Sequence, residues 1–176
     1  APSASNLQPW RFVIVREAEN KKKVARACYE QDWLERAPVL IVVCSLTSVI
    51  EEQFPKHGKL FAKQSVSAAI QNMLLAAEER RLSTCWAGIS SANKIIKALR
   101  IADGVEVHAV IGVGYSITKE TPPPRIHVAD LLSFEQWDSA KVDYVKGVYG
   151  LDSKPLLDKK AVTNLKDKAN NFKAKF

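Results

Sequence analysis

The stretch from Leu60 to Arg80 constrains the fold of this 176-residue chain more than any other. Apolar side chains recur in it at three- and four-residue spacing, which predicts a helix. They are Val66, Ala69, Ile70, Met73, Leu74 and Ala77, and the stripe is widened by Ala68, Leu75 and Ala76. A helix with so wide an apolar surface has to pack against a sheet or lie in a subunit interface, and both at once fit the pattern. We therefore expect a long helix buried on most sides, and a homodimer.

Two apolar runs predict the strands beside this helix. Val39 to Cys44 is a continuous, largely β-branched run behind Pro38, which is typical of a central strand buried on both faces. A second strand is expected over Val105 to Tyr115, whereas residues 48–59, with a proline and a glycine, predict a variable loop. Weaker patterns predict a strand at 11–16, a helix at 17–29, an extended piece at 82–89, a helix at 92–99 and a short element at 131–137. Strands interleaved with helices indicate an α+β or α/β class.

The chain opens with a loop of small polar residues between Pro2 and Pro9. Prolines and small polar residues resist helix formation and leave backbone N–H groups accessible to a ligand. The apolar run from Phe12 to Val15 follows directly and anchors the loop in the core. This arrangement is typical of a binding loop on a rigid support.

Composition and charge narrow the classes of function. Hydrophobic residues make up 47% of the chain, and no apolar run approaches the roughly 18 residues that cross a bilayer. We therefore expect a cytoplasmic protein that binds neither membrane nor nucleic acid. Residues 138–176 form a charged C-terminal extension beyond a domain at 1–137, and their nine Lys and five Asp hold +4 of the net charge of +7. A solvated tail explains this charge, and contact of the tail with a polyanion is the alternative.

Cysteines and histidines do not predict a metal site. Cys28, Cys44 and Cys85 lie far apart, are odd in number and form no C-x-x-C motif, so we expect buried thiols. The three histidines have no spacing typical of metal ligands, and His108 is interpreted as a hydrogen-bonded strand residue rather than a catalyst.

Motifs of self-contained catalysis are not found. The sequence has no G-x-G-x-x-G after a strand, no P-loop, no H-E-x-x-H and no G-x-S-x-G. It does have small-residue loops, aromatic residues and Arg125 behind three prolines. Such a chain is better suited to holding a cofactor that carries the hard chemistry itself.

Four blocks make residues 1–137 resemble the nitroreductase family of FMN-dependent oxidoreductases. They are Ala1-Pro2-Ser3-x-x-Asn6-x-Gln8-Pro9-Trp10-x-Phe12; Ala37 to Cys44; Ala69-x-Gln71-Asn72-Met73-Leu74-Leu75-Ala76-Ala77 with Leu82-x-Thr84-Cys85-Trp86; and Arg125 after Val107 to Gly114. The first block is the most specific, and the order and spacing of all four carry more weight than any one. The resemblance implies an α+β nitroreductase fold, with a mixed or antiparallel central sheet flanked by helices and the long helix at the dimer interface.

The family's activity is implied by the same resemblance. It is a homodimer with FMN at each of two subunit interfaces, reduced by NADH or NADPH and reoxidised by nitroaromatic, quinone or flavin acceptors. Hydride moves directly to and from the flavin, so no catalytic side chain is implied. Two alternatives stay open: a nitroreductase-like protein that binds flavin without turnover, and a basic nucleic-acid-binding module.

The residues implied to bind the cofactor are Pro2, Ser3, Ala4, Asn6, Ser65, Trp86, Ala87, Gly88 and Arg125. The resemblance implies that residues 2–4 contact the flavin held by the partner subunit, while Asn6, Gln8 and Trp10 fix their loop. Residues 86–88 are implied to lie along the isoalloxazine ring, with a backbone N–H facing its reactive nitrogen. Ser65 matches a polar position near the cofactor, and Arg125 matches the phosphate-binding arginine, whose guanidinium suits bidentate phosphate contacts. The plain alternatives are a core Trp86, a helix-surface Ser65 and a surface charge at Arg125.

The sequence departs from the family pattern in three places. The family has an Arg-x-Ser-x-Arg motif, which grips the FMN phosphate, on a helix before the first block, and this sequence lacks the motif. Two explanations stay open: the helix precedes Ala1 in a longer protein, or the protein binds flavin weakly or not at all. Arg81 and Ser83 replace glycines that are common before Thr84, which stiffens the turn beside the ring. The extension at 138–176 is longer than the resemblance implies, and we expect it to wrap the partner subunit.

Overall fold

The computed structural model describes residues 1–116, 121 and 125–137. The chain separates into two units, Ala1–Lys119 and Glu120–Phe176, each of which is described by itself. In the second unit, the described residues form one short helix, α6 (Val128–Leu131). The prediction of a short element at 131–137 was therefore misplaced: His127 caps the helix by accepting a hydrogen bond from the backbone N–H of Ala129, which fixes an earlier start. The predicted extension at 138–176 lies outside the described residues.

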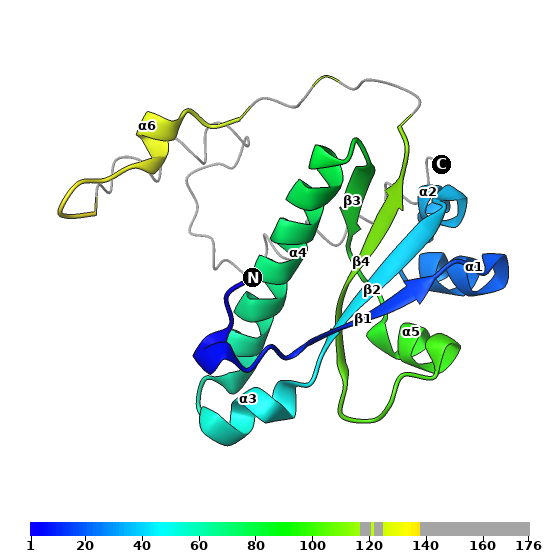
Figure 1. Cartoon of the computed structure of the whole chain (residues 1–176), viewed down its shortest axis with the longest axis horizontal. Helices are drawn as coiled ribbons and strands as arrows, with labels where there is room; N and C mark the ends of the chain where they lie inside the picture. Colours follow the sequence, from blue (N-terminus) through cyan, green and yellow to red (C-terminus); the bar gives the residue numbers. More distant parts are fainter. Residues whose placement is uncertain (117–120, 122–124, 138–176) are drawn as a thin grey trace, which may run out of the picture. The chain divides into compact units, whose positions relative to one another are not determined.

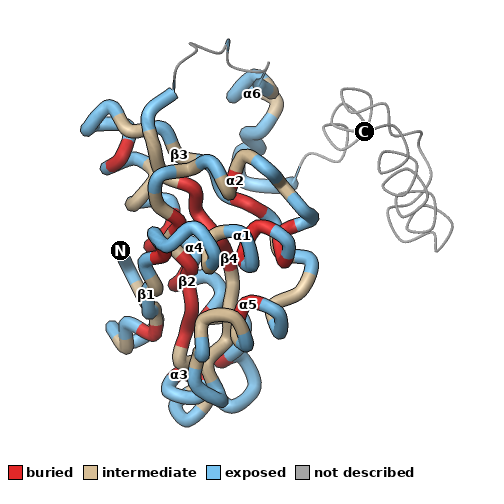
Figure 2. Tube along the Cα trace, turned by 90° about the vertical axis from the view of Figure 1, so that its right-hand side faces the viewer, coloured by how far each residue is buried: buried red, intermediate tan, exposed pale blue. Residues whose placement is uncertain are grey.

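The first unit is built on an antiparallel sheet of four strands in the order β1-β2-β4-β3 (Figure 1). The strands are β1 (Trp10–Val15), β2 (Val39–Ser45), β3 (Ser83–Ala87) and β4 (Glu106–Gly114). The two longest, β2 and β4, lie at the centre, where residues on both faces are buried (Figure 2). This confirms the α+β class and the central position of the run from Val39 to Cys44.

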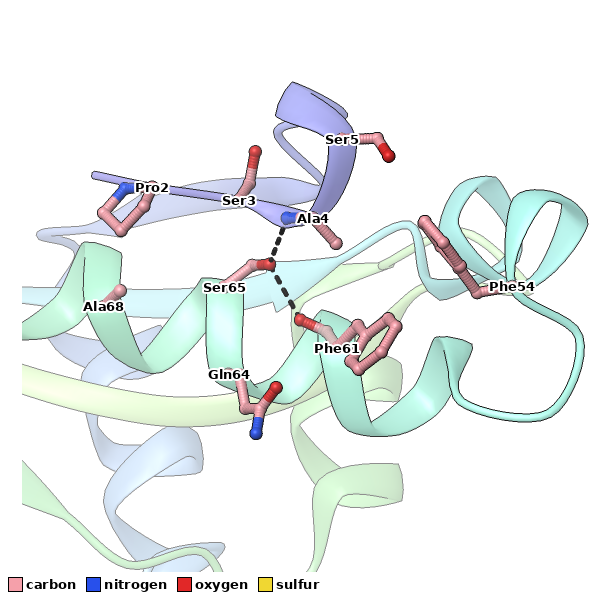
Figure 3. A pocket seen from close by; sticks show the side chains of 9 residues that line it. All are labelled: Pro2, Ser3, Ala4, Ser5, Phe54, Phe61, Gln64, Ser65 and Ala68. Atoms are coloured by element: carbon pink, nitrogen blue, oxygen red, sulfur yellow. Dashed lines mark hydrogen bonds between the residues drawn. The ribbon is translucent and has the colours of Figure 1, made fainter. Parts of the chain in front are cut away.

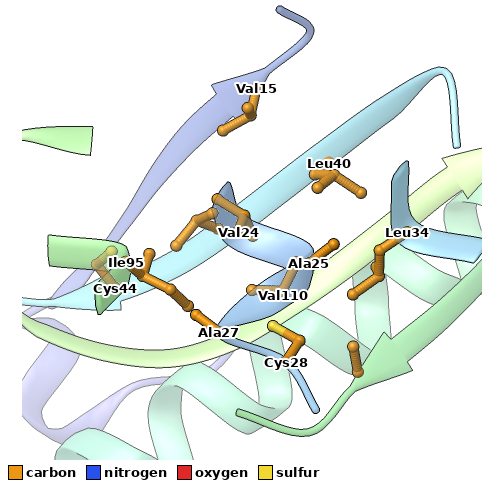
Figure 4. Close-up of a cluster of buried hydrophobic side chains, with 12 residues drawn as sticks. Val15, Val24, Ala25, Ala27, Cys28, Leu34, Leu40, Cys44, Ile95 and Val110 are labelled. Carbon is orange, nitrogen blue, oxygen red and sulfur yellow. The ribbon is translucent and has the colours of Figure 1, made fainter. Parts of the chain in front are cut away.

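Helices cover both faces of the sheet (Figure 1). On one face lie α1 (Ala18–Arg26), α2 (Asp32–Arg36) and α5 (Ala92–Leu99). Their apolar side chains meet alternate residues of β2 in one core (Figure 4). This core includes Val24, Leu34 and Ile95 from the helices, Leu40 and Val42 from β2, and Val110 from β4. Helix α4 (Gly58–Glu79) packs on the opposite face, where its Val66 and Ile70 contact the core formed by Val43, Ala109 and Ile111.

Helix α4 confirms the apolar stripe read from the sequence, but only part of its surface is covered within one chain. Val66, Ala69, Ile70 and Ala77 are buried. Leu75 is 60% exposed and Ala76 is also exposed. Within a single chain, α4 is therefore not buried on most sides as expected. The sheet covers one face of α4 and leaves the face that carries Leu75 exposed.

Residues 48–59 do not form the predicted loop. Most of α3 (Thr47–Gln53) falls within this range, and α4 begins at Gly58. Thr47 and Ile50, three residues apart, are buried, so the segment has a short inward face that its polar residues obscure in the sequence. Gly58 is required at the junction because a Cβ there would lie 2.6 Å from the Cα of Glu51. Across the described ranges, no helix combines the length and apolar character needed to span a membrane.

Candidate functional site

The opening loop folds back on itself before β1. The backbone N–H of Gln8 donates to Ser3 Oγ at 3.1 Å, and Gln8 Nε2 donates to the carbonyl oxygen of Asn6 at 3.0 Å. Ser5, Asn6 and Gln8 all have positive φ, at 45°, 57° and 48°. This left-handed conformation is costly for residues with a Cβ and persists where surrounding contacts enforce it, often in ligand-binding loops. Gln8 therefore fixes the loop, as the family resemblance implied.

Ser65 fastens this loop to α4 (Figure 3). Its hydroxyl donates to the carbonyl oxygen of Phe61 at 2.7 Å and accepts from the backbone N–H of Ala4 at 3.3 Å. The Ser65 side chain is buried, so water does not compete for either bond. Its proton is committed to Phe61, and its observed role is to position the loop.

A first cleft of about 450 Å³ lies between the opening loop and α4 (Figure 3). Its lining brings together the loop residues and one stripe of the helix. The lining residues are Pro2, Ser3, Ala4, Ser5, Phe54, Phe61, Gln64, Ser65 and Ala68. Phe54 and Phe61 meet edge to face, with ring centroids 5.2 Å apart. The cleft therefore combines small residues with an aromatic wall.

A second cleft, also about 450 Å³, lies beside the neighbouring stripe of α4. It is lined by Lys63, Val66, Ser67, Ile70, Trp86, Ile89, Ala92, Val107 and His108. Apolar walls from α4 and the indole of Trp86 stand beside three polar side chains, those of Lys63, Ser67 and His108. The two clefts thus use adjacent stripes of one helix, and the structure divides the predicted site residues between them.

His108 enters the second cleft because β4 contains a bulge. Val43 pairs with Ala109 and Cys44 pairs with Val107, so His108 is the extra residue between two pairs. A bulge re-aims the side chain of its extra residue and is common beside functional sites. The His108 Nε2 lies 2.6 Å from Ser45 Oγ, which confirms the interpretation of His108 as a hydrogen-bonded strand residue.

Burial favours the neutral form of His108. It lowers the pKa of the imidazole from the usual 6.5; nearby Glu106 opposes this shift and Lys63 reinforces it. The same hydroxyl of Ser45 lies 2.8 Å from Thr47 Oγ1, and both Ser45 and Thr47 are buried. A chain of polar groups therefore runs from the interior to the cleft.

The predicted ring-contacting residues do not all face the second cleft. Trp86 lines it and is 43% exposed, which argues against a plain core role. Ala87 is buried in the core on the opposite face of the sheet, so only its backbone is available to the cleft. Gly88 is exposed and lies beside the Tyr29 ring. Arg125 is exposed and belongs to the second unit.

The three cysteine thiols differ in their exposure to solvent. Cys28 and Cys44 are buried as expected, and burial raises the pKa of each thiol to about 11, so both are protonated near neutral pH. The expectation that Cys85 is buried was wrong: it is exposed because β3 is an edge strand. Within residues 1–116, 121 and 125–137, no group of three His, Cys, Asp or Glu side chains forms a possible metal site.

Sequence reasoning missed Lys63, Ser67 and Ser45, and it missed the place of His108 in the lining of the second cleft. A usable signal existed for the first two, because Lys63 and Ser67 lie four residues apart and alternate with Val66 and Ile70 on the same side of the predicted helix. No such signal existed for His108, since a bulge depends on pairing between strands that are distant in the sequence.

Comparisons with known proteins agree on one family. The chain matches the family model described as Nitroreductase family over residues 1–31 and 19–115. It is 35% identical over 119 residues to an Archaeoglobus fulgidus protein provisionally named an NADH dehydrogenase/NAD(P)H nitroreductase, covering 65% of this chain and 66% of that protein. A Methanothermobacter thermautotrophicus protein with the same provisional name is 31% identical over 141 residues, covering 77% and 70% respectively. The chain thus spans about two thirds of these relatives.

Among solved structures, the NADPH:FMN oxidoreductase from Vibrio harveyi in complex with NAD⁺ aligns with a TM-score of 0.73 at 20% identity. The alignment covers 94% of this chain and 76% of that one. At this identity the likeness shows a shared fold.

Proposed function

Because this chain belongs to the nitroreductase family, we propose that it binds FMN, takes electrons from NADH or NADPH, and passes them to nitroaromatic, quinone or flavin acceptors. The names of the two archaeal relatives support NAD(P)H as the reductant. A protein of the same fold named as an NADPH:FMN oxidoreductase supports FMN as the cofactor.

The lining of the second cleft is the observation that carries this proposal. A flavin combines a flat, largely apolar ring with an edge of carbonyl oxygens. The cleft offers an indole and aliphatic side chains next to the donors of Lys63 and Ser67. Its volume of about 450 Å³ falls within the range of small-molecule sites. The residues present therefore fit the ring portion of FMN, which Trp86 would contact through its indole and Lys63 through its ammonium.

The phosphate requires cationic donors, and we propose Arg125 as one of them. Its guanidinium is always charged and can bind phosphate through two parallel hydrogen bonds.

We further propose that the active form is a homodimer. The outward stripe of α4 supports this, since Leu60 and Leu75 are 53% and 60% exposed on one helix. The small side chains of Pro2, Ser3 and Ala4 line an open cleft at the chain's surface, where a partner could approach them. In this arrangement residues 2–4 cover the flavin held by the partner subunit, and Ser65 sets their position.

Bound FMN would supply the chemistry of hydride transfer between nicotinamide and acceptor. The chain contributes binding and electrostatics. Trp86 and Ile70 would exclude water from the ring, and the ammonium of Lys63 would stabilise negative charge on it. The sequence-based prediction that no acid or base side chain is needed stays a prediction.

Anaerobic reduction tests the proposed function. Purified protein loaded with FMN is mixed with NADH or NADPH without oxygen, and the flavin absorbance is followed. We expect the absorbance to bleach, and to return when a quinone is added. Bound flavin that neither nucleotide reduces would contradict an oxidoreductase and leave a flavin-binding protein.

A further inference from the structure

The hydrogen bonds that link Thr47, Ser45 and His108 behind the second cleft run in one direction. Ser45 Oγ lies 2.8 Å from Thr47 Oγ1 and 2.6 Å from His108 Nε2. Thr47 is only 2% exposed, so its hydroxyl proton needs an acceptor inside the protein. Among the described residues, Ser45 Oγ is the acceptor within reach of it. Thr47 therefore donates to Ser45.

The direction of the first bond determines the second. A hydroxyl has one proton, and Ser45 Oγ already accepts from Thr47. Ser45 is itself fully buried, so this proton also needs an acceptor, and among the described residues the remaining partner of Ser45 Oγ is His108 Nε2, which has to be unprotonated. A neutral imidazole then carries its proton on Nδ1. Neutrality agrees with the lowered pKa of this buried ring.

The bulge in β4 brings this ring to the lining of the second cleft. Nε2 is occupied by Ser45, so Nδ1–H is the polar group of His108 left for an occupant. A ring locked by a buried hydroxyl at 2.6 Å loses little freedom when it binds, which makes it a pre-organised donor.

We propose that His108 donates a hydrogen bond from Nδ1 to an oxygen of the molecule in the second cleft, and so selects an occupant with a carbonyl or nitro oxygen beside a flat apolar ring. Ser45 and Thr47 are positioning residues that act through His108. The inference rests on the proposed function, which supplies two sources of such an oxygen: the carbonyl edge of FMN and the electron acceptor. An occupant that presents an N–H at this point would face another donor and is disfavoured.

The first test needs no ligand. The tautomer of His108 is read from ¹⁵N chemical shifts of the imidazole in the ligand-free protein near pH 7.5, with His108→Asn to assign the signals. We expect a proton on Nδ1 and none on Nε2. Ser45→Ala and Thr47→Val should both erode this preference, and Thr47→Ser, which keeps the hydroxyl, should retain it. A wild-type ring protonated on Nε2 would overturn the proposal.

The second test identifies which molecule, FMN or the electron acceptor, supplies the oxygen that His108 binds. His108→Asn places an amide donor near the position of Nδ1, whereas His108→Phe keeps a ring and removes both nitrogens. If the oxygen belongs to FMN, His108→Phe should weaken FMN binding about tenfold and His108→Asn should restore most of the loss. If it belongs to the acceptor, FMN binding is unchanged and the KM for a quinone rises by a similar factor.

If His108→Phe changes neither the affinity for FMN nor the KM for the quinone, the inference is overturned. Failure of the wild type to bind FMN would instead contradict the proposed function and leave the tautomer result standing. Melting temperatures of all variants show whether a loss reflects unfolding.

Discussion

Single hydroxyls and rings define the geometry on both sides of α4. Ser65 holds the opening loop through two bonds, to the Phe61 carbonyl and from the Ala4 N–H. The sequence predicted a polar residue near the cofactor at this position. It could not show that the hydroxyl is used within the protein, because that depends on a contact between residues 61 positions apart.

Ser65→Ala should loosen the opening loop without unfolding the domain. The Ala4 N–H loses its partner, which costs about 0.5–1.5 kcal/mol for a neutral bond. Amide hydrogen exchange of residues 3–8 should accelerate while exchange in β2 stays slow. Ser67→Ala, on the neighbouring stripe of α4, is the matched control and should leave the loop unchanged. Equal exchange in both variants would contradict the anchoring role.

His108 should make the protein less stable in mild acid. Burial lowers its pKa, with Glu106 opposing and Lys63 reinforcing the shift, so the unfolded chain binds a proton near pH 6.5 more readily than the folded one. The stabilisation from the neutral ring is complete above pH 6.5 and is lost as pH falls below it.

Denaturant unfolding of the wild type and His108→Asn at several pH values measures this effect. The free energy of unfolding of the wild type should fall relative to the variant only below pH 6.5. A difference that stays constant across that range would show that His108 does not titrate with folding.

At the scale of elements, periodicity identified the structures with long, regular patterns. The stripe of α4 and the β-branched run of β2 each bury enough side chains for the pattern to be visible in the sequence. Helix α3 was missed because its seven residues bury only two side chains. The bulge of β4 could not be predicted, since it results from the register with β2 rather than from local residue types.

Gly58→Ala should strain the junction of α3 and α4. A Cβ at this position would lie 2.6 Å from Glu51 Cα and 2.8 Å from Glu51 N, and backbone atoms cannot move aside cheaply. We expect a loss of about 1–3 kcal/mol in the free energy of unfolding, as for overpacked sites.

Gly88→Ala is the matched control for this measurement. Its Cβ would lie 3.6 Å from the Tyr29 ring, an ordinary contact. A Gly58→Ala variant as stable as Gly88→Ala would contradict the close packing of the two helices.

At the scale of the molecule, the exposed stripe of α4 is where the proposed dimer can be tested. Leu75→Glu places a charge on a surface that should be buried between subunits, and burying an unpaired charge is strongly unfavourable. We expect the wild type to sediment at about twice the 19.5 kDa chain mass and Leu75→Glu to shift toward one chain. Val49→Glu, at an exposed apolar residue of α3, should stay dimeric. Monomeric wild type would contradict the dimer.

The candidate site was only partly predictable. The first block located the opening loop, and the third located Trp86, because both depend on contiguous residues. The division into two clefts was not predictable, since it follows from which stripe of α4 faces the loop and which faces β3. Lys63 and His108 meet in one cleft only after the sheet has formed.

Titration of the protein with FMN tests whether the second cleft holds the flavin. Quenching of flavin fluorescence should saturate at one FMN per chain. Trp86→Ala should weaken binding about tenfold through loss of ring contact, whereas Trp33→Phe, in the core on the other face, should bind as the wild type does. Absence of saturable binding, or equal affinity in Trp86→Ala and the wild type, would contradict a flavin site in the second cleft.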